Sequence, residues 1–200
     1  MKKNFVSNSP ESVRMFKSPL LEGLSKVPYF VPLLVYVPTI LFFCWLSVQL
    51  NGFFLFLTYL VMGLFVWTLT EYVLHRFIFH FYPSSDWGRR IHFIFHGVHH
   101  DYPNDAKRLV MPPSASIPLA LAFFFLFKWI LQTQMLDGFF AGFLLGYLCY
   151  DITHYMLHHA KFTNSFWKNL KQQHMLHHYD DSTKKYGVTS DFWDKVFRTK

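Results

Sequence analysis

Long apolar runs alternate with polar segments along the chain, and four of the runs approach the length of a membrane span. Residues 29–50 contain no charged residue, and in residues 52–74 the first charge is Glu71. Residues 114–135 contain only Lys128 as a charged residue, and residues 139–158 contain only Asp151. About 20 apolar residues cross the hydrocarbon core of a bilayer as a helix. The pattern therefore predicts four transmembrane helices.

Turn-forming dipeptides separate the apolar runs within each pair. Asn51-Gly52 follows the first run and Asp137-Gly138 follows the third, and such dipeptides favour tight turns. The four runs therefore predict two helical hairpins. Any single run could instead be a buried helix of a soluble protein. Four runs of nearly spanning length favour an all-α integral membrane protein with four transmembrane helices.

The basic residues indicate which end of the hairpins faces the cytoplasm. Two hairpins place the N-terminus, the segment between the hairpins and the C-terminus on one face. Of the 19 Lys and Arg residues, all except Lys128 lie in those three segments. Cytoplasmic loops are rich in Lys and Arg, so both termini are predicted to be cytoplasmic, at a bacterial inner membrane or the endoplasmic reticulum. The net charge of +7 forms no basic stripe, which argues against nucleic-acid binding.

This arrangement predicts an N-terminal segment followed by one membrane domain. Residues 1–28 lack the apolar core and the cleavage site of a signal peptide. Their apolar positions between Val13 and Leu24 are mildly amphipathic, so this segment either lies on the membrane surface or forms a disordered tail. Residues 29–200 form the membrane domain. Within it, residues 75–112 and 159–200 are predicted to form a cytoplasmic helical cap.

All 12 histidines of the chain lie in four short clusters in or beside this cap. Imidazole is a good ligand for iron, zinc or copper, whereas magnesium and calcium prefer oxygen ligands. Histidines confined in this way indicate a site with more than one metal ion. The clusters are His75-x4-His80, His92-x3-His96-x2-His99-His100, His154-x3-His158-His159 and His174-x2-His177-His178.

Two of the clusters contain three histidines that share one helical face. Residues i, i+3 and i+4 lie on one side of a helix, so each of these triplets is predicted to meet one metal ion. His75 and His80 lie about 140° apart on an ideal helix, so they need a bulge, a helix end or two different metal ions. His92 and His159 are either further ligands or ordinary neighbours. The triplets are His96, His99, His100 and His174, His177, His178.

Ten nitrogen ligands are too many for one metal ion and suit two. Structural zinc sites normally close with four ligands and favour Cys. No cysteine lies in a histidine cluster, so the ligands favour redox iron. Glu71 and Asp151 precede histidines at helical spacing, and each either accepts a hydrogen bond from a ligand's second nitrogen or is an ordinary interfacial carboxylate. The expected ligands are His75, His80, His96, His99, His100, His154, His158, His174, His177 and His178.

Longer strings around the histidines resemble the fatty acid hydroxylase superfamily of membrane di-iron enzymes, which also contains sterol desaturases and carotenoid hydroxylases. The resemblance covers residues 55–200. The strings Arg108-Leu-Val-Met-Pro-Pro113 and Tyr150-Asp-Ile-Thr-His-Tyr155 narrow it to the fatty acid 2-hydroxylase branch. Further matching strings are residues 71–80, 92–100, 146–155, 174–178 and 187–193.

The resemblance implies O2-dependent hydroxylation at C2 of a fatty acyl chain, either a free fatty acid or the N-acyl chain of a sphingolipid such as ceramide. The same ten histidines match the ligand positions of the family, and the di-metal centre itself is then the catalytic group. His92 is present in the family pattern without normally being a ligand, and His159 has no clear counterpart. The implied cofactors are two iron ions and O2, with zinc able to replace iron in purified protein.

The resemblance also implies partners. Many eukaryotic members carry an additional cytochrome-b5-like haem domain. Every histidine of this chain lies in a cluster, so we expect no haem in this chain. Electrons are then expected from a separate donor, either a cytochrome-b5-like protein or a ferredoxin with its reductase. The expected substrate is a membrane lipid or acyl compound, with Tyr150 and Tyr155 either lining its path or forming part of an aromatic interface belt.

Two other functions stay open on the sequence alone. Another lipid, such as a sterol or a carotenoid, could be hydroxylated or desaturated, and only the string that begins at Arg108 argues against it. A metal-binding membrane protein, such as a transporter, is the non-enzymatic alternative. Transport would require ionisable residues in the middle of several spans. The four apolar runs are almost free of such residues, which counts against it.

Overall fold

The computed structural model describes residues 5–200, and these residues form helices without any β-strand. Three helical segments are long and apolar enough to cross a membrane. They are α2 (Val31–Val73), which the π-helical turn η1 (Leu74–Phe79) continues, α5 (Pro113–Ile130) and α6 (Thr133–His159). The shorter elements are α1 (Pro19–Leu24), α3 (Asp86–His92), η2 (Phe93–Gly97, π-helical), α4 (Val98–Asp101), α7 (Ser165–Tyr179) and α8 (Phe192–Val196).

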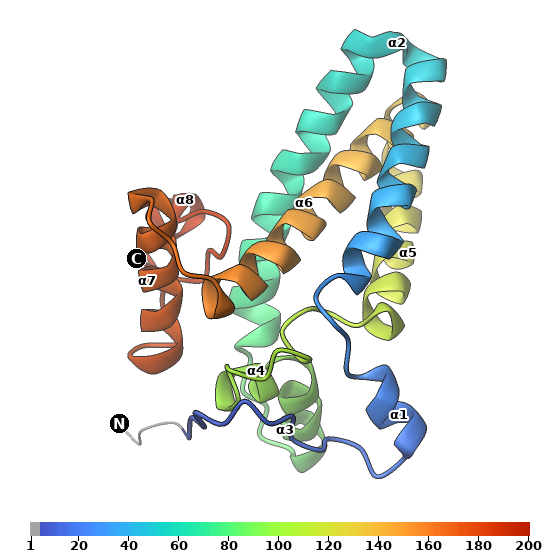
Figure 1. Cartoon of the computed structure of the whole chain (residues 1–200). Helices are drawn as coiled ribbons and strands as arrows, with labels where there is room; N and C mark the ends of the chain where they lie inside the picture. Colours follow the sequence, from blue (N-terminus) through green and yellow to red (C-terminus); the bar gives the residue numbers. More distant parts are fainter. Residues whose placement is uncertain (1–4) are drawn as a thin grey trace.

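The first two predicted spans are the two arms of α2. Gly52 has φ 72° and ψ 171°, a backbone conformation that favours glycine because a side chain would clash there. The chain reverses at this residue, and Figure 1 shows α2 rising in blue and descending in turquoise. The turn predicted at Asn51-Gly52 is therefore present, as a break within one helical segment rather than as a loop between two.

The turn predicted at Asp137-Gly138 is wrong. The chain turns at Leu131 and Gln132, between α5 and α6, and Asp137 and Gly138 lie inside α6. Gly138 serves packing instead of a turn, because a Cβ atom on it would lie 2.6 Å from Oγ of Ser47. The apolar runs at residues 114–135 and 139–158 thus correspond to the helices α5, residues 113–130, and α6, residues 133–159.

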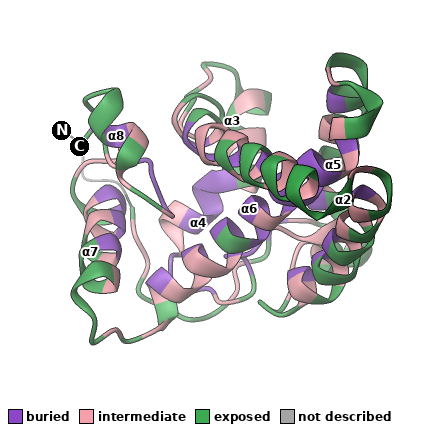
Figure 2. Ribbon diagram, turned by 90° about the horizontal axis from the view of Figure 1, so that it is seen from above, coloured by how far each residue is buried: buried purple, intermediate pink, exposed green. Residues whose placement is uncertain are grey.

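α6 packs against α2 along most of its length, and glycines allow the two backbones to approach closely. A Cβ atom on Gly142 would lie 1.9 Å from the carbonyl oxygen of Leu60. Gly138, Gly142 and Gly146 are spaced four residues apart, the small-residue pattern of closely packed membrane helices. Figure 2 shows the buried positions gathered around α4 and α6 in the middle of the molecule.

The outer faces of α2 and α5 are apolar and exposed. Phe54 on α2 is 84% exposed, and Trp129 on α5 is 83% exposed. A soluble protein rarely exposes a large continuous apolar surface, whereas a lipid-facing surface has this character. The protein is therefore an integral membrane protein, as the apolar runs predicted.

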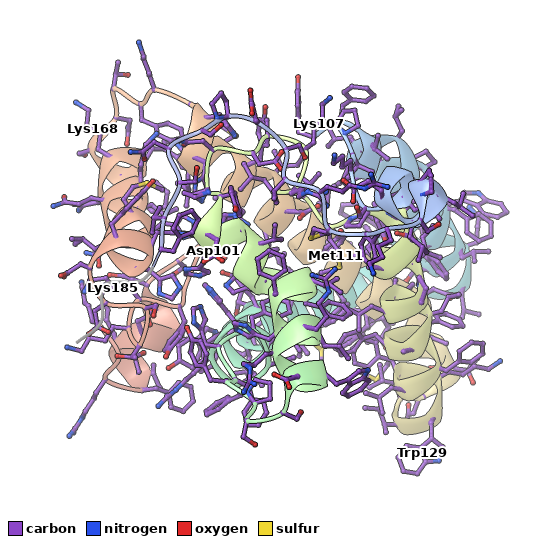
Figure 3. All side chains as sticks on the ribbon, turned by 90° about the horizontal axis from the view of Figure 1, so that it is seen from below. Asp101, Lys107, Met111, Trp129, Lys168 and Lys185 are labelled. Atoms are coloured by element: carbon purple, nitrogen blue, oxygen red, sulfur yellow. The ribbon has the colours of Figure 1, made fainter. Side chains whose placement is uncertain are left out.

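The short helices gather away from the turn at Gly52, with α1, α3 and α4 below the long helices and α7 and α8 beside them (Figure 1). Figure 3 looks onto this end of the molecule. Lys107, Lys168 and Lys185 lie around its edge, and Asp101 and Met111 lie nearer its centre. These three lysines thus lie at the end of the structure that carries the histidine-bearing elements η1, α4 and α7.

Candidate metal centre

Ten histidines meet in two groups of five. Within each group, one ring nitrogen from each histidine lies within 4.8 Å of the others, and every member is buried or half-buried. His92 and His159 belong to neither group. The first histidine group consists of His75, His80, His96, His100 and His177, and the second of His99, His154, His158, His174 and His178.

A π-helical turn brings His75 and His80 together. The N–H of His80 donates to the carbonyl oxygen of His75 at 3.2 Å, so a five-residue step closes the turn. Residues i and i+5 then share one face of the helix, and the Nε2 atoms of the two histidines are 3.3 Å apart. This turn is the bulge that their spacing in the sequence required.

The two HxxHH triplets do not each converge on one metal position, so that interpretation of their spacing is wrong. In each triplet the i, i+4 pair stays together, and the middle histidine, His99 or His177, belongs to the other group. On a helix, residues i and i+4 are only about 40° apart, whereas residue i+3 lies about 60° to the other side. Both triplets therefore supply both groups. The rings of His100 and His178, one from each group, stack with centroids 4.2 Å apart.

Backbone carbonyl groups fix the protons of two histidines in the first group. Nδ1 of His75 lies 2.5 Å from the carbonyl oxygen of Tyr186. Nδ1 of His177 lies 2.5 Å from the carbonyl oxygen of Lys184. A carbonyl oxygen only accepts, so both Nδ1 atoms carry a proton. In the neutral rings of both histidines, Nε2 then carries no proton and has a lone pair available.

These lone pairs fit a metal ion and do not fit hydrogen bonds between histidines. The Nε2 atoms of His75 and His177 both face Nε2 of His80, at 3.3 and 2.9 Å, although His80 has at most one proton to donate there. Two ligands about 2.0–2.1 Å from a metal ion, at right angles to each other, are about 3 Å apart. The second group has similar spacing, with 2.8 Å between the Nε2 atoms of His99 and His154. Both groups therefore suit a metal ion.

Burial keeps these histidines neutral. It lowers the pKa of His80 to about 2, and the neighbouring imidazoles add to this effect. It also lowers the pKa of His177 to about 4, although the hydrogen bond with the carbonyl group of Lys184 acts in the opposite direction. Neutral imidazole is the form that binds metal ions, so these histidines can bind a metal ion at neutral pH without first losing a proton.

The metal-free protein is expected to lose stability as the pH falls below about 6.5. A histidine in an unfolded chain titrates near that value, whereas folded His177 has a pKa of about 4. Between these values the unfolded state binds more protons, so the free energy of unfolding decreases as the pH falls. Thermal unfolding of chelator-treated protein, followed from neutral pH to about pH 4, measures the effect. A melting temperature that stays constant over this range would contradict it.

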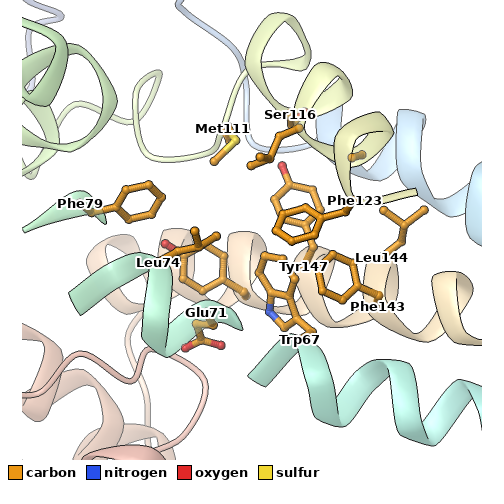
Figure 4. A pocket seen from close by; sticks show the side chains of 13 residues that line it. Trp67, Glu71, Leu74, Phe79, Met111, Ser116, Phe123, Phe143, Leu144 and Tyr147 are labelled. Carbon is orange, nitrogen blue, oxygen red and sulfur yellow. The ribbon is translucent and has the colours of Figure 1, made fainter. Parts of the chain in front are cut away.

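Glu71 and Asp151 were expected either to accept a hydrogen bond from a neighbouring histidine or to be ordinary interfacial carboxylates. The first expectation is wrong for both, because their hydrogen-bond partners are other residues. Glu71 accepts hydrogen bonds from Val188 and Thr189 near the C-terminus. Figure 4 shows its carboxylate pointing away from the aromatic side chains around it. Asp151 accepts a hydrogen bond from the N–H of Met111 at 3.1 Å. The partners seen on His75 and His177 are carbonyl groups, which every residue has and which a sequence pattern therefore does not reveal.

Of the two tyrosines expected either to line the substrate path or to form part of an interface belt, only Tyr150 contacts a histidine of the two groups among the aromatic ring pairs. Its ring stacks on that of His154 with centroids 5.8 Å apart. Its side chain also lines two neighbouring cavities, one of about 250 Å³ against the histidines and one of about 30 Å³. Tyr155 stacks instead on Tyr29, with centroids 4.7 Å apart. Its ring is tilted against that of the exposed His159, with centroids 4.8 Å apart. Tyr155 is not among the residues that line these two cavities.

A cavity of about 250 Å³ lies against the histidines. His96, His99 and His154 form part of its wall, and residues 108–112 and the N-terminal segment form other parts. A smaller and almost wholly apolar cavity of about 30 Å³ lies between α2, α5 and α6 (Figure 4). The two cavities share Phe79, Met111 and Tyr150 in their walls.

The part of the N-terminal segment from residue 15 to residue 25 lines the larger cavity, an arrangement that its amphipathic pattern did not predict. Met15 and Phe16 line the cavity, and their N–H groups both donate to the carboxylate of Glu22. Arg108 donates to the same carboxylate at 2.7 Å. Burial alone would raise the pKa of Glu22, but hydrogen bonds with Lys26 and the two amides, together with the charge of Arg108, lower it to about 2. The ion pair that holds the segment therefore persists at neutral pH.

Comparisons with known proteins find a matching family model, similar sequences and a similar structure. The family model described as fatty acid hydroxylase matches residues 60–199. The dihydroceramide fatty acyl 2-hydroxylase FAH1 of Arabidopsis thaliana is 40% identical over 190 residues, which cover 94% of this chain and 80% of the relative. The solved structure of full-length scs7p, in which only the hydroxylase domain is visible, has a TM-score of 0.84 and 41% identity. The match covers 90% of this chain and 69% of that structure.

Two further relatives are longer than this chain. The ceramide very long chain fatty acid hydroxylase scs7 of Schizosaccharomyces pombe is 39% identical, with 90% of this chain and 53% of the relative covered. Human fatty acid 2-hydroxylase is 34% identical, with 94% of this chain and 56% of the relative covered. The chain thus spans about half of the length of these two proteins.

Proposed function

The chain belongs to the fatty acid hydroxylase family, and from this premise we propose that it hydroxylates C2 of a fatty acyl chain in an O2-dependent reaction. The names of its relatives refer to C2 of fatty acids and to acyl chains of ceramide or dihydroceramide. The proposed substrate is accordingly a free fatty acid or the N-acyl chain of a ceramide. The observation that carries the proposal is the pair of five-histidine groups at the wall of a largely apolar cavity.

The proposed cofactors are two iron ions, one in each histidine group. Ten imidazole ligands without a cysteine suit iron, and zinc can take the same positions in purified protein. Iron bound there supplies the reduction of O2 and the oxidation of the C2–H bond, using electrons from a separate donor, either a cytochrome-b5-like protein or a ferredoxin with its reductase. The histidines hold their neutral, metal-binding form because they are buried.

The cavities support a specific placement of the substrate. C2 lies beside His96, His99 and His154 in the larger cavity, and the apolar chain continues past Tyr150 and Phe79 toward the smaller cavity. The ion pair of Arg108 and Glu22 keeps the N-terminal segment over the larger cavity, which excludes water from the reacting carbon. A dry site strengthens electrostatic interactions with the protein and prevents side reactions.

Four membrane crossings are proposed, made by the two arms of α2, by α5 and by α6. α5 has 18 residues and is about 27 Å long, close to the thickness of the hydrocarbon core. Nδ2 of Asn51 donates to the carbonyl oxygen of Gln134 at 2.8 Å, so the turns of the two hairpins lie together. The opposite end carries the basic residues other than Lys128 and is proposed to face the cytoplasm, at the endoplasmic reticulum or a bacterial inner membrane. Residues 29–200 then form one membrane domain, with residues 75–112 and 159–200 as its cytoplasmic cap.

Lipid analysis after expression tests the proposal. In a host that lacks 2-hydroxylated lipids, expression is expected to produce acyl chains that are heavier by one oxygen atom, with the hydroxyl group at C2. Both donor systems, a cytochrome-b5-like protein and a ferredoxin with its reductase, are co-expressed so that electron supply does not limit the result. Mass spectrometry with fragmentation locates the hydroxyl group. An unchanged acyl profile with metal-loaded protein and both donors present would refute the proposal, and a modified sterol or carotenoid would support the other lipid reaction.

A further inference from the structure

We propose that the C-terminal segment, defined as residues 184–199, determines whether the first histidine group holds its metal ion, and that Glu71 and Asp194 are positioning residues for that group. The inference rests on the proposed function, because it concerns one of the two metal ions of that centre. Both carboxylates act through the backbone of the C-terminal segment, to which they are hydrogen bonded.

The C-terminal segment orients two ligands of the first group. Nδ1 of His75 donates to the carbonyl oxygen of Tyr186, and Nδ1 of His177 donates to that of Lys184, both at 2.5 Å. The two histidines come from η1 and α7, so the segment joins two separate elements. Partners on the second nitrogen fix the orientation of a ligand, and losing them typically costs about 10- to 100-fold in metal affinity.

Asp194 holds the backbone of the segment in place. Its Oδ1 accepts hydrogen bonds from the N–H of Tyr186 at 3.0 Å and from the hydroxyl of Thr199 at 2.8 Å. Its Oδ2 accepts a hydrogen bond from the N–H of Gly187 at 2.8 Å. Asp194 is only 2% exposed, so water does not replace these bonds. The carbonyl group that accepts from His75 belongs to Tyr186, so a change at Asp194 moves that acceptor.

Glu71 joins the segment to α2. Its Oε1 accepts hydrogen bonds from the N–H groups of Val188 at 2.7 Å and Thr189 at 2.9 Å. Its Oε2 accepts a hydrogen bond from the hydroxyl of Thr189 at 2.6 Å. Glu71 lies one helical turn before His75, so the same helix carries both a metal ligand and the side chain that fixes the partner of that ligand.

The second histidine group is supported differently. The Nδ1 atoms of His99, His174 and His178 are buried and have no hydrogen-bond partner among residues 5–200. In the first group, Nδ1 of His80 is likewise buried without a hydrogen-bond partner among residues 5–200. None of the hydrogen bonds of Glu71 and Asp194 described above leads to the second group. Loss of the segment's position should therefore empty one metal position and leave the other.

Asp194→Asn tests this inference by replacing one acceptor oxygen with a donor. The new NH2 group faces the N–H of Gly187, so the backbone of the segment is expected to shift. Full-length protein is loaded anaerobically with ferrous iron, dialysed against a chelator and analysed for metal. The wild type is expected to retain about two ions per chain and the variant about one, because the first position weakens about 10- to 100-fold.

Matched variants separate positioning from loss of charge. Glu71→Ala removes both acceptor oxygens and is expected to retain about one ion, as Asp194→Asn does. Glu71→Gln is expected to restore the second ion, because its amide oxygen accepts from Val188 and Thr189 and its NH2 group can donate to the Thr189 hydroxyl. Asp191→Asn removes a carboxylate of the same segment that pairs with Lys195 and Lys200 at the surface. It is also expected to retain about two ions, since its charge does not hold the segment's backbone.

Double variants identify which metal ion is lost. Asp194→Asn combined with His80→Ala is expected to keep about one ion, because both changes affect the first position. Asp194→Asn combined with His174→Ala is expected to keep almost none. Thermal unfolding of the metal-free proteins checks that each variant is folded. If Asp194→Asn does not fold, Thr199→Val removes one hydrogen bond to the same carboxylate and should cause a smaller loss of the same ion.

The outcomes distinguish this inference from the proposed function. A wild type that binds no metal would refute the metal centre and the inference with it. A wild type that holds two ions while folded Asp194→Asn also holds two would overturn the inference alone. Parallel loss of both ions would mean that the segment supports the whole fold, and this too would overturn the inference.

Discussion

His99→Ala is expected to lower the yield of 2-hydroxylated product by more than about 100-fold, because even the loss of a ligand's hydrogen-bond partner costs about 10- to 100-fold in metal affinity. His99 belongs to the second histidine group, and its Nε2 lies 2.8 Å from that of His154. It also lines the larger cavity, so its removal affects the ion that would face the substrate. The product is measured by lipid mass spectrometry, together with the metal content per chain.

His159→Ala is the matched control for this substitution. His159 directly follows His158 of the second histidine group, but it is exposed and belongs to neither group. Its replacement is expected to leave product and metal content close to wild type. Membrane fractionation checks that both variants are inserted. Equal activity in the two variants would contradict the assignment of His99 as a ligand.

The histidines show what spacing in a sequence can and cannot predict. All ten histidines expected as ligands lie in the two groups. Histidines that are a few residues apart in the sequence are close in space in any fold, so their clustering was a sound guide. The sequence did not predict that His99 and His177 would each face the group opposite to their neighbours. That division depends on how α4 and α7 are rotated about their own axes against the rest of the fold. Local spacing separates the i+3 ring from the i, i+4 pair, but contacts between distant segments decide which group each of them faces.

The hydrogen-bond acceptors of the grouped histidines could not be predicted from the sequence, for a different reason. Two carboxylates at helical spacing were plausible acceptors, but Glu71 reaches Val188 and Thr189 and so supports a carbonyl group of the C-terminal segment. Backbone acceptors are present at every residue, so no residue type marks the ones that bind a histidine. The contact of Glu71 spans more than a hundred residues of sequence and arises only when the C-terminal segment folds back onto α2.

The apolar runs predicted where the long apolar helices lie but not all of their ends. Asp137-Gly138 has the composition of a turn, yet it lies inside α6. The additional signal was available in the sequence, because Gly138, Gly142 and Gly146 repeat every four residues and so mark one helical face. A repeat of this kind indicates a helix that packs closely against another helix, which outweighs a single turn dipeptide.

Gly142→Ala is expected to destabilise the protein by about 3 kcal/mol, the upper end of the usual cost of overpacking a well-packed interior. The added Cβ atom would lie 1.9 Å from the carbonyl oxygen of Leu60 and 2.7 Å from its carbonyl carbon. These are backbone atoms, so no side-chain rotation relieves the contact and α2 must move away from α6. Because His75 follows α2 and His154 lies on α6, the two histidine groups should move apart as well. Thermal unfolding and metal content measure the two effects.

Gly23→Ala provides the control, because nothing lies within 4 Å of a Cβ atom at that position in α1. Alanine is favoured over glycine in a helix by roughly 1 kcal/mol, so this variant should be as stable as wild type or slightly more stable. A difference between the two variants isolates the steric contact from the general effect of replacing glycine. If Gly142→Ala melts at the wild-type temperature and keeps its metal, then the close approach of α2 and α6 is not what holds the two halves of the metal centre together.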